Sequence, residues 1–258
     1  MTDLTKKSEL ECSSNNASAS GLNRNQLKYI AITAMLLDHI GMVFSGFFME
    51  STWGIVLYNA FRVIGRLTAP IMCFFLTEGY IFTRSKKKYA LRLAIFAVIS
   101  QVPYALAHKH SLLTPDFNML FVLLISFGIL CVLDSKFKRY LKILLIFILL
   151  FFSSYCDWGL FGPLMVICFY KLREKPFKLI LVYSLIVLSI VLLSCFFLPA
   201  KGFPWYTELW QLGLFLFIPV LYLYNGQPGS RAPFHKWFFY IFYPLHLLVL
   251  WGIFFYIQ

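Results

Sequence analysis

The sequence predicts an all-α fold, a polytopic transmembrane helical bundle of about nine spans. Hydrophobic residues make up 60% of the chain and charged residues only 13%, and the mean hydropathy is +0.75. Apolar runs of about the length needed to cross a bilayer alternate with short polar segments. Lys and Arg gather in every second polar segment, which is the pattern of cytoplasmic loops. We therefore expect the N-terminus inside and the C-terminus outside.

The chain divides at its first apolar run. Residues 1–26 are rich in Ser, Asn, Lys and Glu and predict a disordered polar cytoplasmic tail. Residues 27–258 predict one transmembrane domain. The formal net charge of +12 lies mainly in the predicted internal loops, and the external loops hold only Lys109 and Lys201. The basic charge therefore reflects membrane topology, and we expect the lipid bilayer, and no nucleic acid, as a partner.

The nine spans follow in order from the apolar runs between these loops. They are predicted at about 27–48, 61–83, 89–107, 118–133, 141–152, 159–170, 179–198, 208–224 and 237–257. Most are long enough for a hydrocarbon core of ~30 Å at about 1.5 Å per helical residue, whereas the fifth and sixth are short. No internal repeat is visible, which argues against a transporter built from duplicated halves.

The first span carries the most informative pair of residues, Asp38 and His39. Asp38 lies roughly 16 Å along the helix from Leu27, near the middle of the hydrocarbon core. A charged group at that depth costs at least ~2.5 kcal/mol, so it marks a functional site by default. The alternative is structural: Asp38 as a member of an ion pair and His39 as a satisfied interior residue.

Adjacent residues on a helix point about 100° apart. Asp38 therefore cannot readily orient the His39 ring, and we expect each to have its own partner on another helix. Arg66, roughly 8 Å from Asp38 along the bundle, is the predicted ion-pair partner. Arg62 has two open interpretations, because its side chain can either snorkel to the surface or bind.

The remaining polar residues sort into layers by depth. His246 in the last span lies at mid-depth, as Asp38 and His39 do. The outer layer holds Arg62, Arg66, Gln101, Tyr104, Asn118 and Asp157, and the inner layer holds Glu78, Tyr80 and Arg92. Polar residues on both sides of a central histidine suit a site reached from both faces. Structural alternatives stay open, namely a Glu78–Arg92 ion pair and core packing of His246 beside Pro244.

Motifs for other chemistries are absent from the sequence. The chain has no HExxH, no GxSxG, no Asp-rich diphosphate motif and no P-loop. We expect no metal, because the histidines predicted at membrane depth number only two and no third ligand is clustered with them. His108, His110 and His235 are predicted in loops.

Five motifs in order carry a resemblance to a known family. They are Leu37-Asp38-His39-Ile40-Gly41; Gly65-Arg66 and Pro70 leading to Glu78-Gly79-Tyr80; Tyr89 and Arg92-Leu93 with Ser100-Gln101 and Pro103-Tyr104; Asp157-Trp158-Gly159 with Gly162; and Tyr240, Tyr243-Pro244 and His246. The chain resembles the TraX family of bacterial membrane proteins, named for a conjugation protein linked to N-terminal acetylation of F-type pilin. TraX proteins are similar in turn to multispan transmembrane acyltransferases that have a key membrane histidine.

The resemblance implies an acetyltransferase domain at 27–258, in the cytoplasmic membrane of a bacterium. The implied acyl donor is cytoplasmic acetyl-CoA. The implied acceptor is a pilin N-terminus or another amine or hydroxyl at the cell surface, such as one on an envelope glycan. The resemblance alone does not make pilin the acceptor.

The residues suit this chemistry. We expect His39 to accept the acceptor's proton or to carry the acetyl group itself, and Arg66 or Tyr80 to stabilise the oxyanion. Asp38 and His246 complete the predicted catalytic group. The predicted contacts to the acetyl-CoA phosphates are Lys86, Lys87, Lys88 and Arg92, and the predicted substrate-binding residues are Glu78, Gln101, Tyr104, Asn118 and Asp157.

Two other function classes fit the same residues. In a proton-coupled transporter or permease, Asp38, His39 and Arg66 would form a relay. A non-enzymatic assembly partner of a surface appendage would need none of these residues for chemistry. Turnover of acetyl-CoA separates the enzyme from both alternatives.

Overall fold

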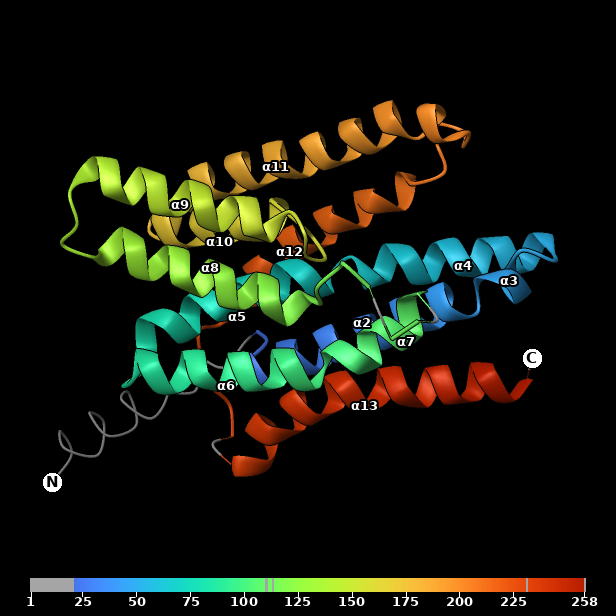
Figure 1. Ribbon diagram of the computed structural model, residues 1–258, viewed down its shortest axis with the longest axis horizontal. Helices are drawn as coiled ribbons and strands as arrows, with labels where there is room; N and C mark the ends of the chain where they lie inside the picture. Colours follow the sequence, from blue (N-terminus) through green and yellow to red (C-terminus); the bar gives the residue numbers. More distant parts are fainter. Residues whose placement is uncertain (1–20, 110, 113, 231, 258) are drawn as a thin grey trace, which may run out of the picture.

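The computed structural model is helical throughout, and no β-strand occurs in the part of the chain that it describes (Figure 1). The described residues are 21–109, 111–112, 114–230 and 232–257. The helices are α2 Arg24–Val43, α3 Ser45–Phe48, α4 Thr52–Gly65, α5 Thr68–Phe82, α6 Lys86–Ile99, α7 Gln101–Lys109, α8 Met119–Asp134, α9 Arg139–Ser153, α10 Phe161–Leu172, α11 Pro176–Phe197, η2 Pro199–Lys201, η3 Leu209–Leu216, α12 Phe217–Leu223 and α13 Pro233–Ile257.

Local sequence signals set where the helices of the site begin. Asn23 caps α2: its side chain accepts from the Gln26 amide, and the Gln26 side chain accepts from the Asn23 amide. This helix starts three residues before the predicted span, and residues 1–20 of the predicted tail lie outside the described residues. Asn118 caps α8 in the same way, by accepting from the Leu120 amide.

Each predicted span coincides with a helix or with two consecutive helices, but several boundaries were wrong. The segment 49–59 was predicted as a connection, whereas α4 already begins at Thr52 and joins α5 in one apolar helical stretch to Phe82. The third span is broken near Ser100, where α6 and α7 meet at a bend of 42°. Because α7 continues to Lys109 and α13 begins at Pro233, His108 and His235 lie on helices and not in the loops predicted for them, and His110 lies outside the described residues.

The described residues contain three helices that are long and apolar enough to cross a membrane, or four if the bent pair α6–α7 is one span. Shorter apolar helices, such as α8 and α10, accompany them. The protein is thus an all-helical protein with membrane-spanning character, and the nine-span topology stays a proposal.

The two ends of the bundle hold different connections (Figure 1). The start of α2 and the α5–α6 and α8–α9 connections lie at one end, here called the inner end. The α3–α4 connection, η2 and the end of α13 lie at the opposite, outer end. Helix α2 packs against α4, α5, α7 and α13 and so lies at the centre of the half that carries Asp38 and His39.

Cysteine labelling of intact cells tests this orientation. In a protein whose six cysteines are replaced by serine, a membrane-impermeant maleimide should label Glu50→Cys and Lys201→Cys, because both positions lie at the outer end. Lys87→Cys and Lys138→Cys should react only after permeabilisation. Labelling of the Lys87 position in intact cells would overturn the proposed orientation.

Candidate functional site

Asp38 is held by two arginines from the neighbouring helix. Arg62 Nη1 donates to Asp38 Oδ1 at 2.8 Å, and Arg66 Nη2 lies 2.8 Å from both carboxylate oxygens. The two arginines are four residues apart on the helical stretch of α4 and share one face. The predicted Asp38–Arg66 pair is confirmed, and Arg62 binds the same carboxylate instead of snorkelling. A Cβ at Gly65 would collide with Asp38, so the close approach of α2 and α4 requires glycine there.

Two tryptophans cover this ion cluster. The Trp210 ring of η3 lies 4.2 Å from the guanidinium carbon of Arg62 and 4.5 Å from that of Arg66, and Trp158 lies 5.2 Å from that of Arg66. Trp158 has a φ of 66°, a left-handed conformation that is strained for a bulky residue. This turn, between α9 and α10, directs the indole toward the cluster. Trp158 was visible in the Asp157-Trp158-Gly159 motif, whereas nothing in the sequence singled out Trp210.

His39 has a separate partner, as its position beside Asp38 predicted. His39 Nδ1 lies 2.7 Å from His246 Nε2, and His246 Nδ1 lies 2.8 Å from the Phe242 carbonyl oxygen. A carbonyl only accepts, so His246 Nδ1 carries a hydrogen, and a neutral His246 then presents an acceptor at Nε2. His39 therefore donates from Nδ1, and its Nε2 keeps a free lone pair when the ring is neutral.

A third histidine belongs to this group. The His108 ring lies 5.4 Å from the His39 ring in an edge-to-face arrangement, and its Nδ1 is 3.2 Å from the Tyr104 carbonyl oxygen. Histidines at membrane depth therefore number three, not the predicted two. Among the described residues, no group of three His, Cys, Asp or Glu side chains is arranged to hold a metal ion.

A small central cavity of about 150 Å³ joins the two groups. Asp38, His39, Arg62 and Arg66 all line it, together with His108. The cavity is mixed in character, with methionine and aromatic side chains on its remaining walls. Its lining is completed by Met35, Met42, Gly65, Thr68, Ala69, Met72, Met119, Asp157, Trp158 and Tyr243.

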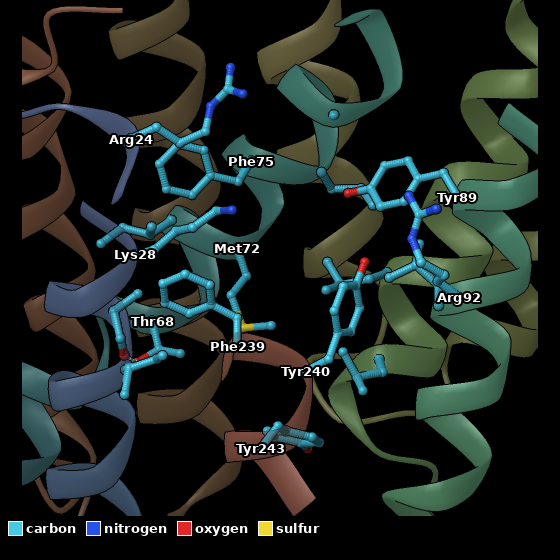
Figure 2. Close-up of a pocket in the computed structure, with 18 of the residues that line it drawn as sticks. Arg24, Lys28, Thr68, Met72, Phe75, Tyr89, Arg92, Phe239, Tyr240 and Tyr243 are labelled. Atoms are coloured by element: carbon cyan, nitrogen blue, oxygen red, sulfur yellow. Dashed lines mark hydrogen bonds between the residues drawn. The ribbon is translucent and has the colours of Figure 1, made fainter. Parts of the chain in front are cut away.

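An inner cavity of about 360 Å³ adjoins the central one. The two share the lining residues Met35, Thr68, Met72 and Tyr243. At the inner end the cavity is lined by three cations, Arg24, Lys28 and Arg92, which Figure 2 shows on opposite walls above an otherwise largely apolar space. Lys28 Nζ lies 4.9 Å from the Phe239 ring centre.

An outer cavity of about 460 Å³ adjoins the central one on the other side. These two share Arg66, Asp157 and Trp158. Lys201 and Glu208 place the outer cavity at the outer end of the bundle. His39 therefore faces the middle member of three adjoining cavities, which is the arrangement expected for a site approached from both ends.

Several predicted site residues lie away from the central cavity. The Tyr80 hydroxyl donates to Asp134 Oδ2 at 2.7 Å, and Tyr170 donates to Asp134 Oδ1 at 2.6 Å. Lys86 completes this cluster, 3.4 Å from Asp134 Oδ2. Tyr80 lines none of the three cavities, so its contacts are those of an inner structural cluster and not of the oxyanion site predicted for it.

The four residues predicted to contact the acetyl-CoA phosphates do not all line one cavity. Arg92 lines the inner cavity, but Lys86, Lys87 and Lys88 are exposed at the start of α6 and line none of the three cavities. Arg24 and Lys28 line the inner cavity as well, although the sequence predicted no site role for either. Their i, i+4 spacing at the start of the first span was the available sign that both face one way.

The predicted substrate-binding residues have mainly structural contacts. Gln101 Oε1 accepts from the Asn118 backbone at 3.1 Å and from its side chain at 2.9 Å, which ties α7 to α8. Tyr104 is buried, with its ring 4.1 Å from His108. Of this group, Asp157 lines both the central and outer cavities.

The predicted Glu78–Arg92 pair was wrong. Glu78 instead lies 3.5 Å from Arg24. Both arginines line the inner cavity, so the actual pairing leaves Arg92 without a carboxylate partner among the ion pairs of the described residues.

Comparisons with known proteins agree with this architecture. A family model described as TraX protein matches residues 23–254. The chain is 32% identical over 233 residues to the probable fimbrial assembly protein FimC, serogroup H1, of Dichelobacter nodosus, which covers 87% of this chain and 93% of the relative. It is 35% identical over 88 residues to an uncharacterized protein of Rickettsia prowazekii (strain Madrid E), which covers 34% and 29%. No solved structure matches the chain. The chain belongs to the TraX family.

Proposed function

We propose that this protein is an integral membrane acetyltransferase that moves an acetyl group from cytoplasmic acetyl-CoA to an acceptor at the outer face. One observation carries the proposal. His39 bonds through Nδ1 to His246 in a buried histidine pair beside a central cavity, and a cavity with a basic mouth adjoins that central cavity on the inner side.

The inner cavity has features that suit acetyl-CoA. Its volume of about 360 Å³ is within the ~300–1,000 Å³ typical of small-molecule sites. Arg24, Lys28 and Arg92 offer charge-assisted hydrogen bonds to phosphates, and the apolar walls suit a thin, weakly polar arm (Figure 2). Lys86, Lys87 and Lys88 would add positive potential at the same end.

The residues of the central cavity can then take separate roles in the transfer reaction. Acetyl-CoA supplies an activated thioester when it is bound. His39 Nε2 accepts a proton from the acceptor amine or hydroxyl as that group attacks the thioester, and can pass the proton to the CoA thiolate that leaves. Alternatively, Nε2 takes the acetyl group itself, again with the CoA thiolate as leaving group, since both routes use the same lone pair. His246 accepts from His39 Nδ1 and so fixes the tautomer. Arg66, held by Asp38, lines the cavity where an oxyanion would develop.

The acceptor is a surface amine or hydroxyl. The name of the Dichelobacter nodosus relative, a probable fimbrial assembly protein, supports a pilus subunit, and an envelope glycan is the other candidate. Acetylation of a supplied pilin or glycan by the purified protein distinguishes them.

Charge removal at the inner cavity tests the donor site. Lys28→Gln and Arg92→Gln should each raise the acetyl-CoA concentration at half-maximal binding about tenfold, because each removes a charge-assisted contact. Lys138→Gln is the matched control, since that exposed lysine lines none of the three cavities. Binding to purified protein should be measured by filtration with labelled acetyl-CoA. Wild-type protein that binds none, or equal effects of all three variants, would contradict this donor site.

The same purified protein also distinguishes an acetyltransferase from a permease and from an assembly partner. A permease using the three adjoining cavities would move its cargo without consuming the thioester. An assembly partner would neither bind nor consume it. Free thiol released from acetyl-CoA by the wild-type protein therefore supports the enzyme and excludes both alternatives as the sole function.

A further inference from the structure

His108 places a second imidazole beside His39 in the central cavity. Its ring lies 5.4 Å from the His39 ring in an edge-to-face arrangement, and both residues line that cavity. His108 Nδ1 lies 3.2 Å from the Tyr104 carbonyl oxygen. Because a carbonyl only accepts, Nδ1 carries the hydrogen, and Nε2 has a lone pair when the ring is neutral. Two imidazoles with an Nε2 lone pair therefore line the central cavity.

The two histidines differ in their contacts and in their access to water. His39 is buried and bonds through Nδ1 to His246, whereas His108 is partly exposed. His108 lies in the last turn of α7, which Figure 1 shows between α6 and the outer end. The next residue, Lys109, is exposed and pairs with Asp116. His108 therefore lies on the side from which the proposed acceptor arrives, where a proton can pass to water.

A transfer through an acetylated His39 requires two basic groups in the cavity. Once Nε2 of His39 holds the acetyl group, its lone pair is used in the new bond, so this nitrogen cannot accept the acceptor's proton in the second step. His246 cannot replace it, because its Nε2 faces His39 Nδ1 and its Nδ1 carries a hydrogen bonded to the Phe242 carbonyl oxygen. The base of the second step must therefore be another group that lines the cavity.

Two carboxylates also line the central cavity, but neither is as well placed as His108. Asp38 uses both of its oxygens to accept from Arg66. Asp157 lines the wall shared with the outer cavity, whereas the His108 ring contacts His39 itself. Imidazole is also the side-chain base that enzymes use most often.

We propose that His39 is the nucleophile of a two-step transfer and that His108 is the base of its second step. This inference rests on the proposed acetyl transfer and chooses the covalent one of its two routes. It makes His108 a catalytic residue, because its Nε2 takes the proton of the acceptor. The contact of its ring with Tyr104, 4.1 Å between ring centres, then holds the imidazole in place.

The bonds and protons of the two steps balance. In the first step His39 Nε2 attacks the thioester carbon, the carbon–sulfur bond breaks and the CoA thiolate leaves. In the second step the nitrogen or oxygen of the acceptor attacks the acetyl carbon, and the electron pair of the breaking bond returns to His39 Nε2. The acceptor's proton passes to His108 Nε2 and from there to water. The CoA thiolate takes one proton from water.

Two measurements on the purified protein separate the steps. Exchange of label between CoA and acetyl-CoA, with no acceptor added, requires only the first step and its reversal. Release of thiol from acetyl-CoA, with water as the acceptor, requires both steps. His108→Gln should leave the exchange rate within about twofold of wild type and lower thiol release by about 10²-fold or more, the contribution of one general base. His39→Ala should abolish both.

Further variants distinguish a base from a packing residue. His108→Glu retains a side-chain base and should recover part of the thiol release, which lost packing against Tyr104 would not allow. Asp157→Asn removes the rival base and should lower thiol release less than His108→Gln does. His235→Gln removes a histidine that lines none of the three cavities and should change neither rate. Size-exclusion profiles identify any variant that fails to fold, and His108→Asn replaces His108→Gln if the latter fails.

The outcomes separate this inference from the proposed function. Wild-type protein that releases thiol without exchanging label would show direct transfer, and equal losses of both rates in His108→Gln would show a structural role. Full thiol release by His108→Gln, or a larger loss in Asp157→Asn, would assign the second step to another base. Each of these results overturns the role of His108 and leaves the acetyltransferase intact. Wild-type protein that neither exchanges label nor releases thiol would refute the acetyl transfer itself, and this inference with it.

Discussion

Replacing His39 with alanine should lower acetyl transfer by about 10²–10⁴-fold, the range that one general acid–base group contributes. The reason is the free Nε2 lone pair, which no other described group in the central cavity duplicates with the same support from His246. Thiol release from acetyl-CoA and acetyl incorporation into the acceptor should fall together. Both are measured on purified protein with matched size-exclusion profiles.

Control variants show whether the effect belongs to this histidine. His235→Ala removes a histidine that bonds to Tyr29 and lines none of the three cavities, and should keep near wild-type turnover. His246 acts through His39 as a positioning residue, so His246→Ala should reduce turnover and also shift its pH profile. His246→Gln retains an oxygen that can accept from His39 Nδ1, and should recover part of the loss. Equal turnover by wild type and His39→Ala would refute the proposed chemistry.

Asp38→Asn should destabilise the protein by about 3–5 kcal/mol, the cost of leaving buried charge without its partner. It leaves two arginines uncompensated, so it should cost more than Arg66→Gln, after which Arg62 still neutralises Asp38. The double variant Asp38→Asn with Arg66→Gln should recover part of the folded protein. Fluorescence-detected size exclusion after a heating series measures all four proteins.

An exposed ion pair provides the comparison. Lys109 and Asp116 lie 2.9 Å apart, with side chains 51% and 42% exposed, and such pairs contribute at most about 1 kcal/mol. Asp116→Asn should therefore leave the thermal profile nearly unchanged. Additive losses from Asp38→Asn and Arg66→Gln, with no recovery in the double variant, would show that the two residues are not energetically coupled.

The sequence was most informative about depth and about which residues cannot share a partner. Depth follows from counting residues along a helix, and this placed Arg66 roughly 8 Å from Asp38 along the bundle, within reach of its long side chain. Because Asp38 and His39 are adjacent on one helix, the sequence predicted separate partners for them. Asp38 binds Arg62 and Arg66, and His39 binds His246. The same count placed His246 at the right depth. It could not predict the His39–His246 contact, because rotation about each helix axis depends on packing between distant segments.

Other predictions also failed because the neighbours of a side chain depend on how distant segments pack. His108 was predicted in a loop, but α7 continues past the bend at Ser100 and places its ring beside His39. Arg24 and Lys28 were interpreted through the charge of their segment, which determines sidedness and not the direction of a side chain. Glu78 and Arg92 were matched by depth alone, whereas Glu78 pairs with Arg24 of α2.

The volume of the central cavity also limits which acyl groups fit beside His39. A protein cavity of about 150 Å³ holds one molecule the size of benzene, and the central cavity has about that volume. It therefore has room for a two-carbon acyl group and the attacking atom, but not for the tail of a fatty acid. Selection for short acyl chains would follow from lack of space and not from recognition of the methyl group. Met35 and Met72 form part of the wall toward the inner cavity, from which the acyl group enters. Because methionine side chains adapt easily, this wall would tolerate a slightly longer acyl chain than the rest of the cavity does.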